Sequence, residues 1–136
     1  MTVPLNPSIV GQAEKVHTVI LSRALAGTGL DETQWITLNQ SIAIDPADRT
    51  ALLAHVVSAT KFDAALVESA ISRLNERDLL EGAQPTELGR TLVTDVRASL
   101  APILARAYGQ VSDEDSRTAS KVLITITAAL SQELGA

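Results

Sequence analysis

Five side chains between residues 49 and 73 are of types that can bind a nucleic-acid backbone or a base edge. They are Arg49, Lys61, Ser69, Ser72 and Arg73. Arginine and lysine neutralise phosphates, and hydroxyl groups form hydrogen bonds with phosphates and bases. We expect the five to act together if two helices joined by a few residues carry them, with the second helix facing outward.

Residues 63–77 predict that outward helix. Its apolar residues recur at helical spacing and form an inward stripe, Val67, Ala70, Ile71 and Leu74. The preceding helix opens at Pro46, with Asp45 as its cap, and continues to about Thr60. Periodicity alone favours a plainer alternative, in which residues 63–77 are an ordinary amphipathic core helix of an all-α domain.

Further helices surround this pair, so we predict a mainly α fold. One spans about residues 8–25, and Asp31 with Gln34 forms a capping box for the next, whose buried stripe is Trp35, Leu38 and Ile42. Pro102 predicts a kink or break near residues 99–101 of a long fifth helix. Ser112, with Asp115 three residues on, caps the last helix.

Composition limits what the chain can be. Its 136 residues, 46% of them hydrophobic, suit a single domain spanning residues 1–136. The absence of cysteine excludes disulfides, thiolate metal sites and cysteine redox sensing. The first residues lack the basic and apolar regions of a signal peptide, so we expect a cytoplasmic protein without a membrane partner.

Catalytic and metal-binding patterns are missing from the sequence. His17 and His55 are not at the spacing of paired metal ligands, and no glycine-rich phosphate loop or nucleophile elbow is present. The acidic run 113–115 sits at a helix start, where carboxylates complement the helix dipole without a metal. We therefore expect no enzyme activity, no cofactor and no metal site.

Charge is distributed unfavourably for binding DNA. Residues 31–90 hold five basic and ten acidic side chains, whereas the rest of the chain is neutral. Phosphate binding depends on cations, so the few in this segment must converge on one face. An alternative for Arg73 and Arg77 is ordinary surface pairing with Glu76 and Asp78.

The order of motifs resembles the MarR family of winged helix-turn-helix regulators over roughly residues 10–134. Residues 85–92, Pro-Thr-Glu-Leu-Gly-Arg-Thr-Leu, are similar to the family's Leu-Thr-x-x-Gly-x-x-Leu at the start of helix five. Leu79-Leu80 resembles the Leu-Val that opens the wing, and residues 111–115 resemble the Leu-Ser-x-Glu-Asp turn. The resemblance implies dimerisation helices at 8–26 and 86–135, with a helix-turn-helix lobe at 31–85.

Two features depart from the family pattern. Family wings are longer hairpins with an arginine for the minor groove, but only Glu81-Gly82-Ala83-Gln84 lies between Leu80 and Pro85. We expect four residues to be too few for two strands and a tip, so the wing is reduced or absent. Glu68 also occupies a position that is often polar or basic, where without neighbouring cations it would repel phosphate.

The resemblance implies a homodimeric transcriptional regulator that binds duplex DNA. It also implies a small-molecule effector, for which the candidate contacts are His17, Trp35, His55 and Tyr108. Core packing is the alternative for these aromatic residues. The alternative function is a degenerate dimer that does not bind DNA and instead binds a protein or a small ligand.

Overall fold

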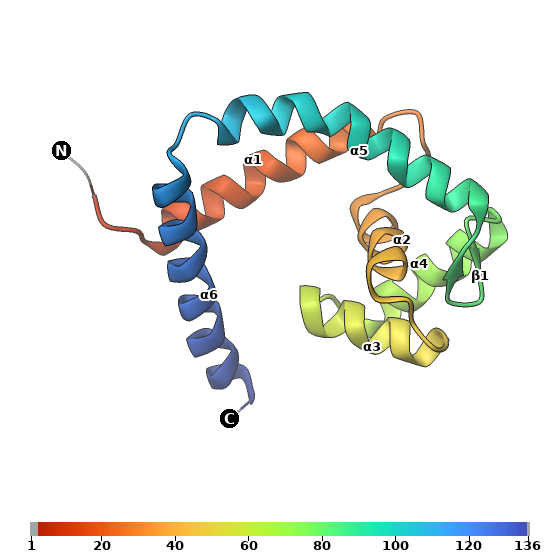
Figure 1. Ribbon diagram of the computed structural model, residues 1–136. Helices are drawn as coiled ribbons and strands as arrows, with labels where there is room; N and C mark the ends of the chain where they lie inside the picture. Colours follow the sequence, from red (N-terminus) through yellow and green to blue (C-terminus); the bar gives the residue numbers. More distant parts are fainter. Residues whose placement is uncertain (1–2, 136) are drawn as a thin grey trace. The chain divides into compact units, whose positions relative to one another are not determined.

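The computed structural model describes residues 3–135, which form six helices and one two-stranded hairpin (Figure 1). The chain divides into two compact units, residues 1–100 and 101–136. The elements are α1 (Pro7–Leu25), α2 (Glu32–Ile44), α3 (Arg49–Thr60), α4 (Ala64–Glu76), β1 (Leu80–Glu81), β2 (Gln84–Pro85), α5 (Glu87–Tyr108) and α6 (Asp113–Gly135). This is the mainly α architecture that the sequence predicts.

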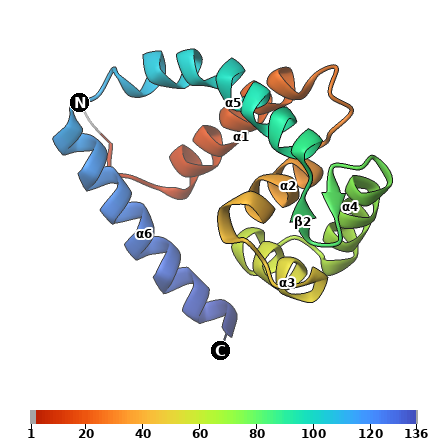
Figure 2. The same cartoon turned by 45° about the vertical axis from the view of Figure 1, so that its right-hand side comes forward.

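The core of the first unit lies between α2, α3 and α4, which pack together beside the hairpin (Figure 2). The predicted inward stripe of α4 is confirmed, since Val67, Ala70, Ile71 and Leu74 are all buried. Leu38 of α2 and the two buried residues of α3 meet that stripe and are fully buried themselves: Leu38, Leu52 and Val56. The opposite side of α4 is therefore left facing solvent.

Short acidic side chains fix where these helices begin. The predicted capping box of α2 is present: the Asp31 carboxylate accepts from the backbone N–H of Gln34, and the Gln34 side chain accepts from the backbone N–H of Asp31. The predicted cap of α3 is wrong, because Asp48 caps it and accepts from Ala51 N at 2.8 Å. Asp45 instead ends α2 in the left-handed conformation, at φ 48°.

The hairpin corrects the expectation that four residues cannot make two strands. Leu80 and Pro85 themselves join the ladder, so that Leu80 pairs with Pro85 and Glu81 with Gln84. The turn then needs only Gly82 and Ala83, and glycine supplies the positive φ of 65°. The result is a minimal wing with strands of two residues each.

Thr86 joins the hairpin to α5. Its hydroxyl Oγ1 donates to the carbonyl oxygen of Asp78 at 2.6 Å and accepts from the backbone N–H of Gly89 at 3.0 Å. Its own backbone N–H donates to the carbonyl oxygen of Leu79 at 3.1 Å. Thr86 thus caps α5 while it fastens the end of the hairpin to the segment after α4.

Of the kink or break predicted near residues 99–101, the break is not present, because α5 continues through Pro102 to Tyr108, and the kink stays a prediction. A single proline removes one hydrogen bond, and the remaining turns of a long helix keep theirs. In the second unit, α6 begins as predicted, with Ser112 Oγ accepting from Asp115 N at 3.0 Å. Within residues 3–135, no helix combines the length and apolar character needed to cross a bilayer.

Candidate nucleic-acid interface

The solvent-facing side of α4 carries the best-placed of the predicted contacts. Ser69 and Arg73 are both exposed and lie one turn apart on this side. Lys61 is exposed just before α4, where it ends α3 with φ 62° and donates its backbone N–H to Val57 O at 2.8 Å. Asp63 caps α4 by accepting from Ala65 N at 3.0 Å.

Arg49, at the first position of α3, is bound across the surface to α4. Its Nε donates to Glu68 Oε1 at 3.2 Å, and its Nη2 donates to Ser72 Oγ at 2.7 Å and to the backbone oxygen of Glu68 at 3.3 Å. The expectation that Glu68 lacks a neighbouring cation is therefore wrong. Two of the five predicted contacts, Arg49 and Ser72, are engaged with each other.

Side chains of the lobe hold the small wing in place. Asn75 of α4 accepts from Gly82 N at 2.9 Å and donates to Gly82 O at 3.1 Å. Gln84 donates from Nε2 to the carbonyl oxygen of Pro46 at 2.5 Å, and Ala83 is buried. The hairpin is thus tied to the lobe at its turn and at its second strand.

Arg77, which ends α4, does not pair with Glu76 or Asp78. Its Nη2 donates to the carbonyl oxygen of Thr28 at 2.7 Å, and its guanidinium covers Gly29 in the turn between α1 and α2. Arg49, by contrast, does form an ion pair, with Glu68 at 3.2 Å. The sequence interpretation of Arg73 and Arg77 as partners of Glu76 and Asp78 is therefore not what the structure shows.

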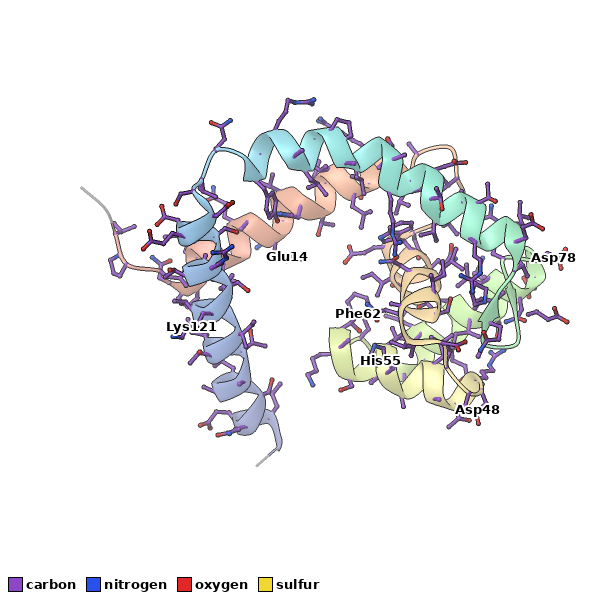
Figure 3. All side chains as sticks on the ribbon, viewed as in Figure 1. Glu14, Asp48, His55, Phe62, Asp78 and Lys121 are labelled. Carbon is purple, nitrogen blue, oxygen red and sulfur yellow. The ribbon has the colours of Figure 1, made fainter. Side chains whose placement is uncertain are left out.

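The four predicted effector contacts lie on four helices. Trp35 of α2 is buried in the core, and His55 extends from α3, where its Nε2 lies 2.9 Å from Gln40 Oε1 of α2 (Figure 3). His17 lies on α1 with its Nδ1 2.7 Å from Ala13 O, and Tyr108 belongs to the second unit. The effector site remains a prediction.

A shallow hollow lies between the start of α2 and the exposed side of α4. It is lined by Asp31, Thr33, Gln34, Leu66, Ser69, Ala70 and Arg73. None of the predicted effector contacts lines this hollow, but two predicted nucleic-acid contacts, Ser69 and Arg73, do. In the part of the chain described, no three histidine, aspartate or glutamate residues gather closely enough to hold a metal ion.

The sequence reasoning missed the partners that fix this surface. Asn75 and Gln84 carried no motif, and the link from Arg49 to Glu68 spans 19 residues of sequence. The sequence held only part of the signal for this link. It placed Arg49 at the start of one helix and Glu68 about one turn into the next, and the two can meet only if the helices pack closely. That packing distance is a tertiary property, which helical periodicity does not contain.

Comparison with solved structures identifies the arrangement. A regulator from Bordetella bronchiseptica whose DNA binding responds to 6-hydroxynicotinic acid matches 92% of this chain and 98% of its own, with TM-score 0.69 and 20% identity. A MarR family protein from Mycobacterium tuberculosis, solved with DNA, matches 92% of this chain and 98% of its own, with TM-score 0.68 and 17% identity. The PcaV regulator from Streptomyces coelicolor, solved with its natural ligand, matches 95% of this chain and 99% of its own, with TM-score 0.71 and 13% identity.

Sequence comparisons alone do not reach this result, since neither a family model nor a curated protein matches the chain. The structural likeness nevertheless extends over nine tenths of this chain and nearly all of each of the three structures. The chain therefore has the MarR-like winged helix-turn-helix fold, with a wing reduced to a two-residue ladder.

Proposed function

We propose that this protein is a homodimeric, MarR-like transcriptional regulator that binds duplex DNA through the exposed side of α4. The observation that carries the proposal is that Ser69 and Arg73 stand exposed on the second helix of a capped helix pair. A similar fold is found in a protein solved with DNA. The second helix of such a pair enters the major groove, and its first turns contact base edges.

The charge of the lobe sets how this surface binds. Lys61 and Arg73 are exposed cations, and Arg49 offsets the negative charge of Glu68. The wing adds no cation, since Glu81 is the one charged residue between Leu80 and Pro85 and it is acidic. We therefore expect weak non-specific binding and a footprint confined to the major groove, because few phosphates are neutralised.

Dimerisation rests on the apolar side chains of the terminal helices. Those of α6 lie on more than one side of the helix, and those of α1 are also exposed: Ile9, Val10, Val16, Val19, Val122, Leu123, Ile124, Ile126, Leu130 and Leu134. Exposed apolar area of this extent usually marks an interface, and a two-fold dimer presents the same patch from both chains. Two copies of α4 would then contact two half-sites.

An effector is the remaining part of the proposal. Two of the similar structures concern a small molecule, 6-hydroxynicotinic acid in one and a natural ligand in the other. An effector of this kind would act here by favouring one spacing of the two α4 helices over another. His17, Trp35, His55 and Tyr108 stay as its candidate contacts.

A second function is favoured by the acidic lobe. Because Arg49 and Ser72 already bond to each other and the hairpin is held by Asn75, few groups remain for DNA. The alternative is a dimer that has lost DNA binding and instead binds a protein or a small ligand. Both functions use the same fold, so affinity for DNA separates them.

The test is fluorescence anisotropy with a pool of genomic duplexes that includes the upstream region of the gene, at low and near-physiological salt. We expect saturable binding to one duplex, weakened in Arg73→Ala and unchanged in Arg117→Ala. Arg117 is the matched control because it is an exposed arginine on α6, outside the helix pair. No binding by the wild type at low salt would contradict the proposal and favour the second function.

A further inference from the structure

An arginine from a neighbouring helix holds Glu68 on the DNA-facing lobe. The guanidinium of Arg49 contacts one carboxylate oxygen, the backbone oxygen of the same residue and the hydroxyl of Ser72. These three contacts restrict the position of the Arg49 guanidinium far more than a single ion pair would. Because Nε and Nη2 of this held guanidinium both lie 3.2 Å from Glu68 Oε1, they favour one direction of the carboxylate.

The pair nevertheless remains accessible. The side chains of Arg49 and Glu68 are 39% and 52% exposed. An ion pair at this exposure contributes little to folding, since solvent screens it. Its main effects are local: Arg49 offsets the negative charge of Glu68 on α4 and holds the carboxylate at the surface of that helix.

Unused hydrogen-bonding groups remain on both partners. Among the bonds formed by residues 3–135, Glu68 Oε2 accepts none and Arg49 Nη1 donates none. A carboxylate accepts from the exocyclic amino group of cytosine in the major groove. Glu68 is the fifth residue of α4, in the half of such a helix that contacts bases.

We propose that Glu68 reads a cytosine in each half-site, with Arg49 as the residue that positions its carboxylate and lowers its repulsion of phosphate. This inference rests on the proposed function, because it requires α4 to enter the major groove. In a lobe with so few cations, the contact from Glu68 to cytosine supplies the base specificity. Arg49 Nη1 supplies a hydrogen bond to the neighbouring phosphate.

The experiment selects bound sequences from a randomised duplex library, first with the wild type and then with two variants of the pair. We expect the wild type to prefer cytosine at one position per half-site. Glu68→Gln should lower that preference about 5- to 100-fold in favour of adenine, because glutamine can also donate and pairs with the N6 and N7 of adenine. Arg49→Met should relax the same position, because the carboxylate is no longer held there.

Glu76→Gln is the matched control, since it removes the same charge from the exposed end of the same helix. It should raise affinity for all sequences without changing base preference. Glu68→Gln behaving in the same way would overturn the inference while leaving the proposed function intact. Failure of the wild type to bind any duplex would instead contradict the proposed function, and circular dichroism confirms that each variant is folded.

Discussion

The carbonyl oxygen of Leu79 occupies the space where a side chain at Gly89 would begin. An ideal Cβ at this glycine would lie 2.2 Å from that oxygen, well inside van der Waals contact. The close approach lets α5 pack directly on the segment that opens the wing. Glycine is therefore needed at the last position of the Thr-x-x-Gly pattern for a steric reason that involves no ligand.

Gly89→Ala should therefore destabilise the protein. We expect a loss of about 1–3 kcal/mol in the free energy of unfolding, the usual cost of overpacking a buried site. Urea denaturation measures it. The control is Gly11→Ala, where the nearest atom to a new Cβ is the Lys15 Nζ at 3.8 Å. There the same change should be neutral or stabilising, because alanine favours a helix, and equal losses at both positions would contradict the steric explanation.

Asn75→Ala should loosen the wing. The variant removes both hydrogen bonds to Gly82 and the bond from Asn75 Nδ2 to the carbonyl oxygen of Ile71, but it leaves the buried stripe of α4 unchanged. We expect a cost of about 1–3 kcal/mol, typical of three partly exposed hydrogen bonds, and faster amide exchange at residues 81–84. Ser58→Ala, at an exposed position of α3, is the control. Unchanged exchange in the hairpin would show that Asn75 does not hold it.

Arg77→Met should free the turn between α1 and α2. Methionine keeps much of the side-chain length but cannot donate to the carbonyl oxygen of Thr28. We expect faster amide exchange at residues 27–30, with DNA affinity reduced much less than in Arg73→Ala. A loss of affinity as large as that of Arg73→Ala would place Arg77 among the DNA contacts instead.

Leu130→Glu should dissociate the proposed dimer. Leu130 is 62% exposed on α6, and a charge there would be buried in the interface. Sedimentation velocity should show a monomer for this variant and a dimer for both the wild type and Gln132→Glu, because Gln132 is exposed on the side of α6 opposite Leu130. The first unit should keep its unfolding transition. A monomeric wild type would contradict the dimer.

Most of the fold was predictable because it depends on local patterns. The stripe of α4 and the capping box of α2 follow from spacing within one helix, and the structure confirms both. The errors arose where two conformations compete over a few residues. Asp45 and Asp48 are both good caps, and the structure uses Asp45 at the end of α2 and Asp48 at the start of α3.

The candidate site was less predictable. The sequence identified Arg73 and Lys61 as exposed cations, but it treated Glu68 as an isolated negative charge. Its partner Arg49 was already in the same set of candidates, with nothing in the spacing to join the two. The prediction that no hairpin forms was wrong for a similar reason. Each strand includes one residue of a flanking motif, Leu80 in the first and Pro85 in the second.

The salt dependence of DNA binding tests the central claim most directly. For a dimer that neutralises phosphates with Arg73, the logarithm of affinity should fall linearly with the logarithm of salt concentration, and Arg73→Ala should reduce the slope by about 2, one contact from each chain. Arg117→Ala should leave the slope unchanged. Equal slopes for wild type and Arg73→Ala would contradict the assignment of α4 as the DNA-binding helix, and no binding at low salt would contradict the regulator itself.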